Sequence, residues 1–154
     1  MLGRTYDREN CSAARALEIV GERWSLLIIR CAAFGGATRF TTFQRKLGIA
    51  PNILSNRLDR FVEAGLMRLQ PLASEPETYE YLLTSKGRDL VPVLIALTEW
   101  GDRYAAPSGP PVRFEHDGCG GTVHHHLSCD TCRKEPTPTQ LAARPGPGAR
   151  PGQF

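Results

Sequence analysis

Four metal-binding side chains near the C-terminus have the spacing that most directly indicates chemistry. They form two pairs, His116 with Cys119 and Cys129 with Cys132, and each pair has two residues between its members. This spacing lets both side chains reach one ion across a tight turn, and Gly120 leaves room for such a turn. One imidazole and three thiolates complete a tetrahedral set for Zn2+ with no open position. We therefore expect a structural zinc site and not a catalytic one.

The nine residues between Cys119 and Cys129 are enough for a small hairpin. His124 to His126 provide replacement ligands if His116 is displaced. A segment this small has little core, so the metal would supply much of its folding free energy. The alternative is a flexible tail with free thiols, or with a disulfide between Cys129 and Cys132.

A second group of side chains has the chemistry of DNA recognition. Between residues 51 and 62, apolar side chains recur at helical spacing at Leu54, Leu58, Phe61 and Val62. Asparagine pairs well with adenine and arginine with guanine, and the first turn of such a helix usually enters the major groove. The opposite side of this predicted helix carries Asn52, Ser55, Asn56, Arg57 and Arg60.

Positive charge is concentrated around this helix. The whole chain of 154 residues has 19 Lys and Arg against 16 Asp and Glu, a net charge of +3 that marks no polybasic protein. Residues 39–68 alone hold six basic side chains against two acidic ones. A local excess larger than that of the whole chain favours a nucleic-acid partner for this segment.

The surrounding pattern predicts a helix-turn-helix. A helix capped by Ser12 runs through Val20, and Gly21 separates it from a second helix that ends at Gly35-Gly36. A short third helix begins at Thr41 or Thr42 and ends at Gly48. Pro51 then suits the first position of the fourth helix, and Gly65 its left-handed end.

The period changes after Gly65. Met67–Leu72 and Thr78–Leu83 alternate as paired strands, joined by residues 73–77, and thereby form a wing. Thr84 caps a further helix through about Tyr104, and Pro92 marks either a kink in it or its true start. The fold class is therefore mainly α with a β-hairpin wing, a winged helix-turn-helix with a small Cys/His-rich C-terminal appendage.

Composition sets the domains and the location. We expect a DNA-binding and dimerisation domain over 1–104, a linker over 105–112, a zinc-binding hairpin over 113–135 and a disordered tail over 136–154. The sequence has no run of 18 apolar residues and no secretory signal at its N-terminus, so we expect a cytoplasmic protein. Its five cysteines are too few for a disulfide scaffold.

An ordered set of motifs over about residues 7–104 resembles the HxlR-type winged helix-turn-helix regulators, relatives of the MarR regulators. The motifs are Cys11-Ser-Ala-Ala-Arg-Ala-Leu17, Gly21-Glu-Arg-Trp24, Arg39-Phe40, Leu54-Ser-Asn-Arg-Leu58, Gly65-Leu66, Tyr81-Leu-Leu-Thr84, Gly87 and Trp100-Gly101. Two departures are Ser12, where the family has proline, and Glu22-Arg23, where it usually has Gly-Lys.

The resemblance implies a dimeric bacterial transcription factor, most simply a repressor, that is not an enzyme. We also expect DNA contacts from Arg39, Thr41, Thr42 and Pro51, and a phosphate contact from Arg68 at the base of the wing. The tip of the wing, Ala-Ser-Glu-Pro-Glu, is acidic and unsuited to a minor groove. Cys11 matches the reactive thiol of redox-sensing members, so it is a candidate sensor of oxidants or electrophiles. The alternative is an unreactive cysteine at the dimer interface, whereas Cys31 falls on an apolar stripe and should lie in the core.

The last helix carries two apolar stripes, one of Leu90, Leu94 and Leu97 and one of Val93, Ala96, Trp100 and Tyr104. A helix that is apolar on two sides must bury both, so one stripe should face a partner subunit. Two-fold symmetry then predicts a palindromic operator with half-sites roughly 10 bp apart or a multiple of that. A single wide stripe that faces the core is the alternative.

Two other classes of function stay open at this point. The protein could be a thiol redox protein that uses Cys11 or the C-terminal cysteines. Every histidine lies beyond residue 115, however, so no Cys/His pair is placed in the predicted folded domain. It could also be a protein-interaction adaptor built on a winged helix, which the Arg- and Asn-rich face disfavours.

Overall fold

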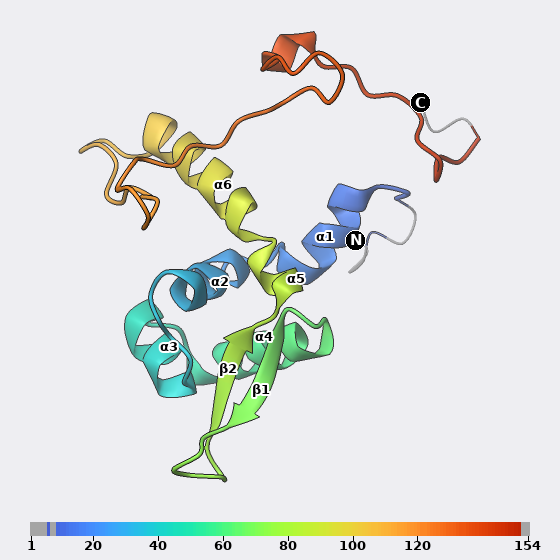
Figure 1. The fold of residues 1–154 in the computed structure, drawn as a ribbon. Helices are drawn as coiled ribbons and strands as arrows, with labels where there is room; N and C mark the ends of the chain where they lie inside the picture. The colour runs from blue at the N-terminus through green and yellow to red at the C-terminus, as the bar shows by residue number, and fades with distance from the viewer. Residues whose placement is uncertain (1–5, 7–8, 152–154) are drawn as a thin grey trace. The chain divides into compact units, whose positions relative to one another are not determined.

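The computed structural model describes residue 6 and residues 9–151. Their contacts divide the chain into two compact units, the first with Tyr6 and Ser12–Leu94 and the second with residues 9–11 and 95–151. The elements follow the order of a winged helix-turn-helix, as expected (Figure 1). They are α1 (Ser12–Val20), α2 (Ser25–Ala33), α3 (Phe40–Leu47), α4 (Pro51–Glu63), β1 (Met67–Pro71), β2 (Tyr79–Leu83), α5 (Ser85–Arg88), α6 (Val91–Tyr104) and the short 3-10 helix η1 (Pro138–Gln140).

The helix-turn-helix consists of α3, α4 and the short turn between them. Arg39 is extended and takes the N-cap position, so α3 begins at Phe40, slightly earlier than the expected Thr41 or Thr42. Gly48 ends α3 in the left-handed conformation with φ of 62°. Ala50 is extended, and Pro51 is the first residue of α4, where its missing N–H breaks no helical hydrogen bond.

The end of α4 is a Schellman motif, which explains why the chain turns sharply into the wing. Gly65 has φ of 71°, its N–H donates to the Val62 carbonyl at 3.0 Å, and the Leu66 N–H donates to the Phe61 carbonyl at 2.8 Å. Leu66 is buried directly after this turn. The left-handed stop predicted at Gly65 is thus confirmed.

The wing is a two-stranded antiparallel sheet of β1 and β2 in which Met67 faces Leu83 and Pro71 faces Tyr79. Both predicted strands are confirmed, each one residue shorter at the end next to the tip. The Tyr81 N–H donates to the Thr38 carbonyl at 2.7 Å, so β2 is tied to the segment that leads into α3.

The single helix expected from Thr84 to Tyr104 is two helices. The Thr84 side chain accepts a hydrogen bond from the Gly87 N–H at 3.2 Å and caps the four-residue α5. A new helix, α6, begins at Val91 with Pro92 as its second residue. Of the two interpretations of Pro92, a true helix start is therefore correct.

The core of the first unit lies where α2, α3, α4 and the wing meet. Its largest fully buried side chains are Phe43, Phe61, Ile28, Ile29, Leu54, Leu58 and Met67. Cys31 is also buried there, as predicted. None of the helices in the described part of the chain is long and apolar enough to cross a membrane.

Candidate nucleic-acid interface

The exposed side of α4 is the part of the helix-turn-helix that offers hydrogen-bonding groups. Asn52, Ser55, Asn56 and Arg60, which we call the reading face, are all exposed. They recur at spacings of three and four residues, opposite the buried Leu54 and Leu58. Asp59 shares this side, and its carboxylate lies 3.4 Å from the Ser55 hydroxyl. The reading face presents amide, hydroxyl and guanidinium groups of the kind that contact base edges and phosphates.

Arg57 does not belong to this exposed side, and the expectation that it does was wrong. Arg57 is only 8% exposed. Its guanidinium lies 3.2 Å from the carboxylate of Glu22, a residue of the turn between α1 and α2. The sequence contains a signal for this placement. Arg57 follows Leu54 by three residues and precedes Phe61 by four, so helical spacing puts all three on the buried side.

Glu22 is the partner of Arg57 that the sequence interpretation missed. Its side chain is 57% exposed and holds the buried Arg57 through the ion pair. The departure from the family pattern at Glu22 was visible in the sequence. Only the fold, however, shows that this position faces α4.

The residues expected to contact DNA from outside α4 have different exposures. Arg39, Thr41 and Pro51 are exposed, and Thr42 is half-buried. Nearby, the Lys46 ammonium donates to the Gly35 carbonyl at 2.6 Å, which ties α3 to the end of α2.

Arg68 lies on β1, exposed, and donates to the Gln70 side chain at 2.6 Å. The tip of the wing beyond it is acidic, with Glu75 and Glu77 both exposed. Within the tip, the Thr78 hydroxyl donates to the Glu75 carboxylate at 3.1 Å. The base of the wing is therefore cationic and its tip anionic, which fits a phosphate contact at the base only.

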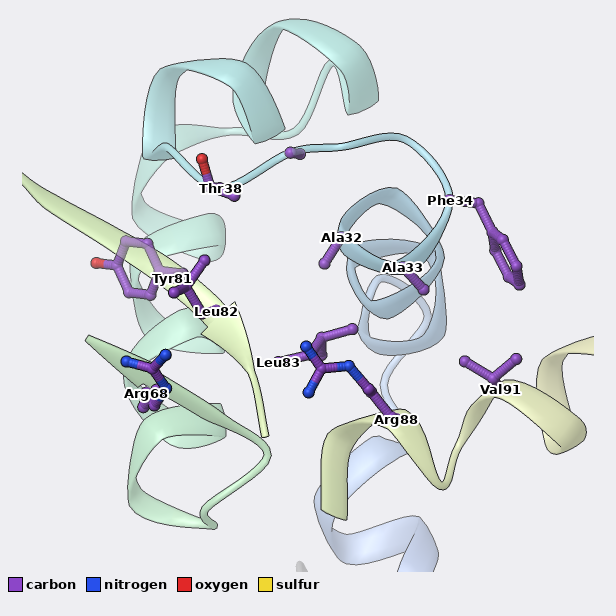
Figure 2. Close-up of a pocket in the computed structure, with 11 residues that line it drawn as sticks. Ala32, Ala33, Phe34, Thr38, Arg68, Tyr81, Leu82, Leu83, Arg88 and Val91 are labelled. Carbon is purple, nitrogen blue, oxygen red and sulfur yellow. The ribbon is translucent and has the colours of Figure 1, made fainter. Parts of the chain in front are cut away.

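A cavity of about 530 Å³ lies between the wing, α2 and the start of α6, within the first unit. Figure 2 shows Arg68 and Tyr81 from the hairpin on one side and Ala32 and Ala33 of α2 on the other, with Arg88 of α5 between. Burial, and to a lesser extent the negative charge of Asp59, raises the pKa of Tyr81 above its ordinary value. An apolar wall with two guanidinium groups suits an organic anion.

The two cysteines of the N-terminal half lie in opposite environments. Cys31 is buried in the core, and this burial raises the pKa of its thiol although Lys46 and Arg30 oppose the effect. Cys11 is exposed and directly precedes α1. Of these two thiols, only Cys11 is open to a reagent in solution.

The expected metal ligands are brought together in pairs. The His116 imidazole Nδ1 lies 3.4 Å from Cys119 Sγ. Backbone N–H groups of Cys132 and Thr131 donate to the Cys129 sulfur, and these hydrogen bonds lower the pKa of that thiol. Among the residues that the structure describes, no three His, Cys, Asp or Glu side chains gather closely enough to hold an ion.

Comparison with known proteins gives this geometry a context. The family model for HxlR-like helix-turn-helix proteins matches residues 19–109. An uncharacterized HTH-type transcriptional regulator of Mycobacterium tuberculosis is 46% identical over 141 residues, which cover 91% of this chain and 89% of the relative. A match of that length extends beyond the family model into the Cys/His-rich segment.

Two solved structures resemble the fold. A candidate transcription factor, PA1607, superposes with a TM-score of 0.80 and 37% identity, over 90% of this chain and 97% of that one. The redox regulator HypR in its reduced form superposes with a TM-score of 0.54 and 26% identity, over 60% of this chain and 92% of HypR.

Proposed function

This chain belongs to the HxlR-like helix-turn-helix family, whose members are transcriptional regulators and not enzymes, and from that premise we propose that it is a homodimeric repressor of palindromic operator DNA. The observation that carries the proposal is the reading face of α4. Asn52, Ser55 and Asn56 are exposed on the first turns of the second helix of a helix-turn-helix, the part that enters the major groove in such motifs.

The proposal of a dimer rests on α6. Along this helix the exposed apolar side chains are Val93, Leu97, Trp100 and Tyr104, each at least half exposed. They follow one another at steps of four, three and four residues and therefore form one stripe, whereas Leu94 is buried in the core. Leu97 therefore lies on the exposed stripe that a partner subunit would cover. The sequence pattern had placed it on the other stripe, with Leu94.

The proposal of repression assumes that the operator overlaps the promoter of the protein's own gene. A dimer on an operator within its own promoter would exclude RNA polymerase. Deletion of the gene should then raise transcription from a reporter fused to that promoter. A fall in transcription would instead identify an activator.

The reading face is tested by binding of DNA from upstream of the protein's own gene. Asn56→Ala should weaken specific binding by about 1–3 kcal/mol, since a bidentate contact to a base edge is lost. Arg60→Ala should weaken binding to specific and unrelated DNA alike and reduce the salt dependence by about one ion, as expected for a phosphate contact. Fluorescence anisotropy over a salt series measures both effects.

Arg144→Ala is the matched control for Arg60→Ala, because it removes the same charge from an exposed position in the C-terminal segment. It should bind DNA like the unmodified protein. If Asn56→Ala and Arg60→Ala also bind like the unmodified protein while keeping their fold, the reading face is misassigned. A winged-helix adaptor for another protein would then be the better interpretation.

We further propose that Cys11 makes the DNA affinity responsive to oxidants or electrophiles. Its exposure supports this role, as does the likeness to a redox regulator. Diamide should lower operator binding, dithiothreitol should restore it, and Cys11→Ser should abolish the response. Operator binding that diamide leaves unchanged would contradict the proposal.

A further inference from the structure

Two short turns of the second unit have the same construction, although they are thirteen residues apart and differ in sequence. In the first, the carbonyl of His116 accepts hydrogen bonds from the N–H groups of Cys119 at 3.0 Å and Gly120 at 2.7 Å. In the second, the carbonyl of Cys129 accepts from the N–H of Arg133 at 2.9 Å. In both turns, therefore, the residue after the second candidate ligand closes back on the first.

The backbone after each pair is left-handed. Gly120 has φ of 70° and Arg133 has φ of 58°. Arg133 is the one non-glycine residue with positive φ in the described part of the chain, a conformation that side chains other than Asn, Asp and Gly rarely adopt. In both turns this left-handed residue comes directly after the second candidate ligand. It closes the tight turn that brings positions i and i+3 together.

The side chains converge within each turn. His116 Nδ1 lies 3.4 Å from Cys119 Sγ, so both atoms face the same point. In the second turn the backbone N–H groups of Thr131 and Cys132 face the Cys129 sulfur, so the turn wraps around this donor atom. Each turn thus presents two donor atoms of the kinds that zinc prefers.

Little else in this segment can hold it together. Of residues 113–135, only Phe114 and Cys129 are half-buried, and all the others are exposed. A short hairpin pairs Glu115 with Thr122, and the N–H of His116 donates to the Gly121 carbonyl at 2.9 Å. A segment with this little apolar burial needs another source of folding free energy, such as a bound metal.

We propose that a structural Zn2+ ion joins the two turns, with His116, Cys119, Cys129 and Cys132 as its four ligands. Each cysteine gives its proton to solvent when it binds, and His116 binds as the neutral imidazole. The ion draws together the two pairs, which in this structure stand as separate pairs. All four ligands follow the winged helix in the chain, so the site shares no residue with the reading face.

Two of the three neighbouring histidines, His124 and His126, have their imidazoles engaged elsewhere, which favours His116 as the imidazole ligand. His124 Nδ1 lies 2.9 Å from the Glu99 carboxylate, and His126 Nδ1 lies 3.2 Å from that of Glu135. His116 instead has its nitrogen beside a candidate ligand sulfur. The choice between these histidines is therefore open to direct test.

Elemental analysis of the full chain, purified from zinc-supplemented cells, tests the site. We expect roughly one zinc per chain, lost in Cys119→Ser, Cys132→Ser and His116→Asn. Cys11→Ser and His126→Asn are the matched controls, each removing a side chain of the same type from outside the set, and both should retain the metal. Operator binding measured on the same samples separates failure of this site from failure of the reading face.

Cobalt substitution provides a readout that does not depend on the variants folding. Co2+ in a tetrahedral site with three thiolates gives intense visible absorption and a thiolate-to-metal charge-transfer band, whereas Co2+ in water does not. Absence of this spectrum together with absence of zinc would overturn the proposal. So would a disulfide between Cys129 and Cys132 in protein purified under reducing conditions, or zinc retained by both cysteine variants.

Discussion

At the scale of single residues, one ion pair holds α4 to the chain that precedes it. Arg57 is buried against the core and finds its counter-ion in Glu22, whose own side chain is mostly in water. A buried guanidinium that loses its carboxylate keeps its desolvation cost without the compensating interaction. Solvent around Glu22 screens part of the attraction, so the pair has a moderate effect on stability.

We expect Glu22→Ala to lower the free energy of unfolding by about 1–2 kcal/mol, because it leaves Arg57 buried and unpaired. Glu77→Ala, which removes an exposed carboxylate from the tip of the wing, should change it by no more than about 0.5 kcal/mol. Urea unfolding followed by circular dichroism measures both. Equal effects of the two variants would mean that the ion pair adds no measurable stability.

The sequence predicted the apolar side of α4 and the burial of Cys31 because helical spacing alone determines them. It did not predict the partner of Arg57. The charge of an arginine favoured an exposed side chain at position 57, whereas helical spacing favoured a buried one. The buried position is possible because Glu22, from another part of the chain, supplies a counter-ion. The same limit applies to Leu97, because its spacing fits either apolar stripe and only the packing of α6 decides between them.

At the scale of elements, the junction between α4, the wing and α5 depends on two glycines for different reasons. Gly65 needs a left-handed backbone, and an added Cβ there would meet no atom within 4 Å. Gly87 lies where two elements approach closely, and an added Cβ would lie 2.2 Å from the Leu66 carbonyl oxygen. Position 65 thus requires a residue that tolerates a left-handed backbone, whereas position 87 requires a residue without a side chain.

Gly65→Ala should therefore cost about 1 kcal/mol, the penalty of a left-handed alanine, and Gly65→Asn should cost less. Gly87→Ala should cost about 2–3 kcal/mol because α5 must move away from the Leu66 carbonyl. Asparagine should give no relief at position 87. Thermal unfolding of the four variants measures this pattern, and a lower cost for Gly87→Asn than for Gly87→Ala would contradict the steric explanation.

The boundaries of these elements followed from local chemistry to within a residue or two. Gly48, Pro51, Gly65 and Thr84 each act through their own backbone or side chain, so the sequence contains the information directly. Two helices after Thr84 were harder to predict, because Pro92 is compatible with either a kink or a start. Whether the helix is kinked or begins anew depends on the direction of the chain between Arg88 and Val91. That direction is set by tertiary contacts.

At the scale of the whole molecule, the exposed stripe of α6 makes a prediction about assembly. Leu97→Asp places a charge in the middle of the stripe and should shift a dimer towards monomers, since burying an unpaired carboxylate is costly. Val112→Asp is the control, because Val112 is 55% exposed but lies outside α6. Sedimentation velocity over a range of concentrations distinguishes the two, and identical behaviour of both variants would remove α6 from the interface.

The contact between Glu22 and Arg57 also has a thermodynamic consequence. It connects the turn after α1 with the helix that carries the reading face, so a change at α1 that broke this contact would alter the free energy of α4. Such coupling is reciprocal: whatever an event at α1 does to the affinity for an operator, the bound operator does to that event by the same factor. The cysteine that precedes α1 would then react at different rates in free and in DNA-bound protein. The ratio of these two rates would measure the coupling between this cysteine and the reading face.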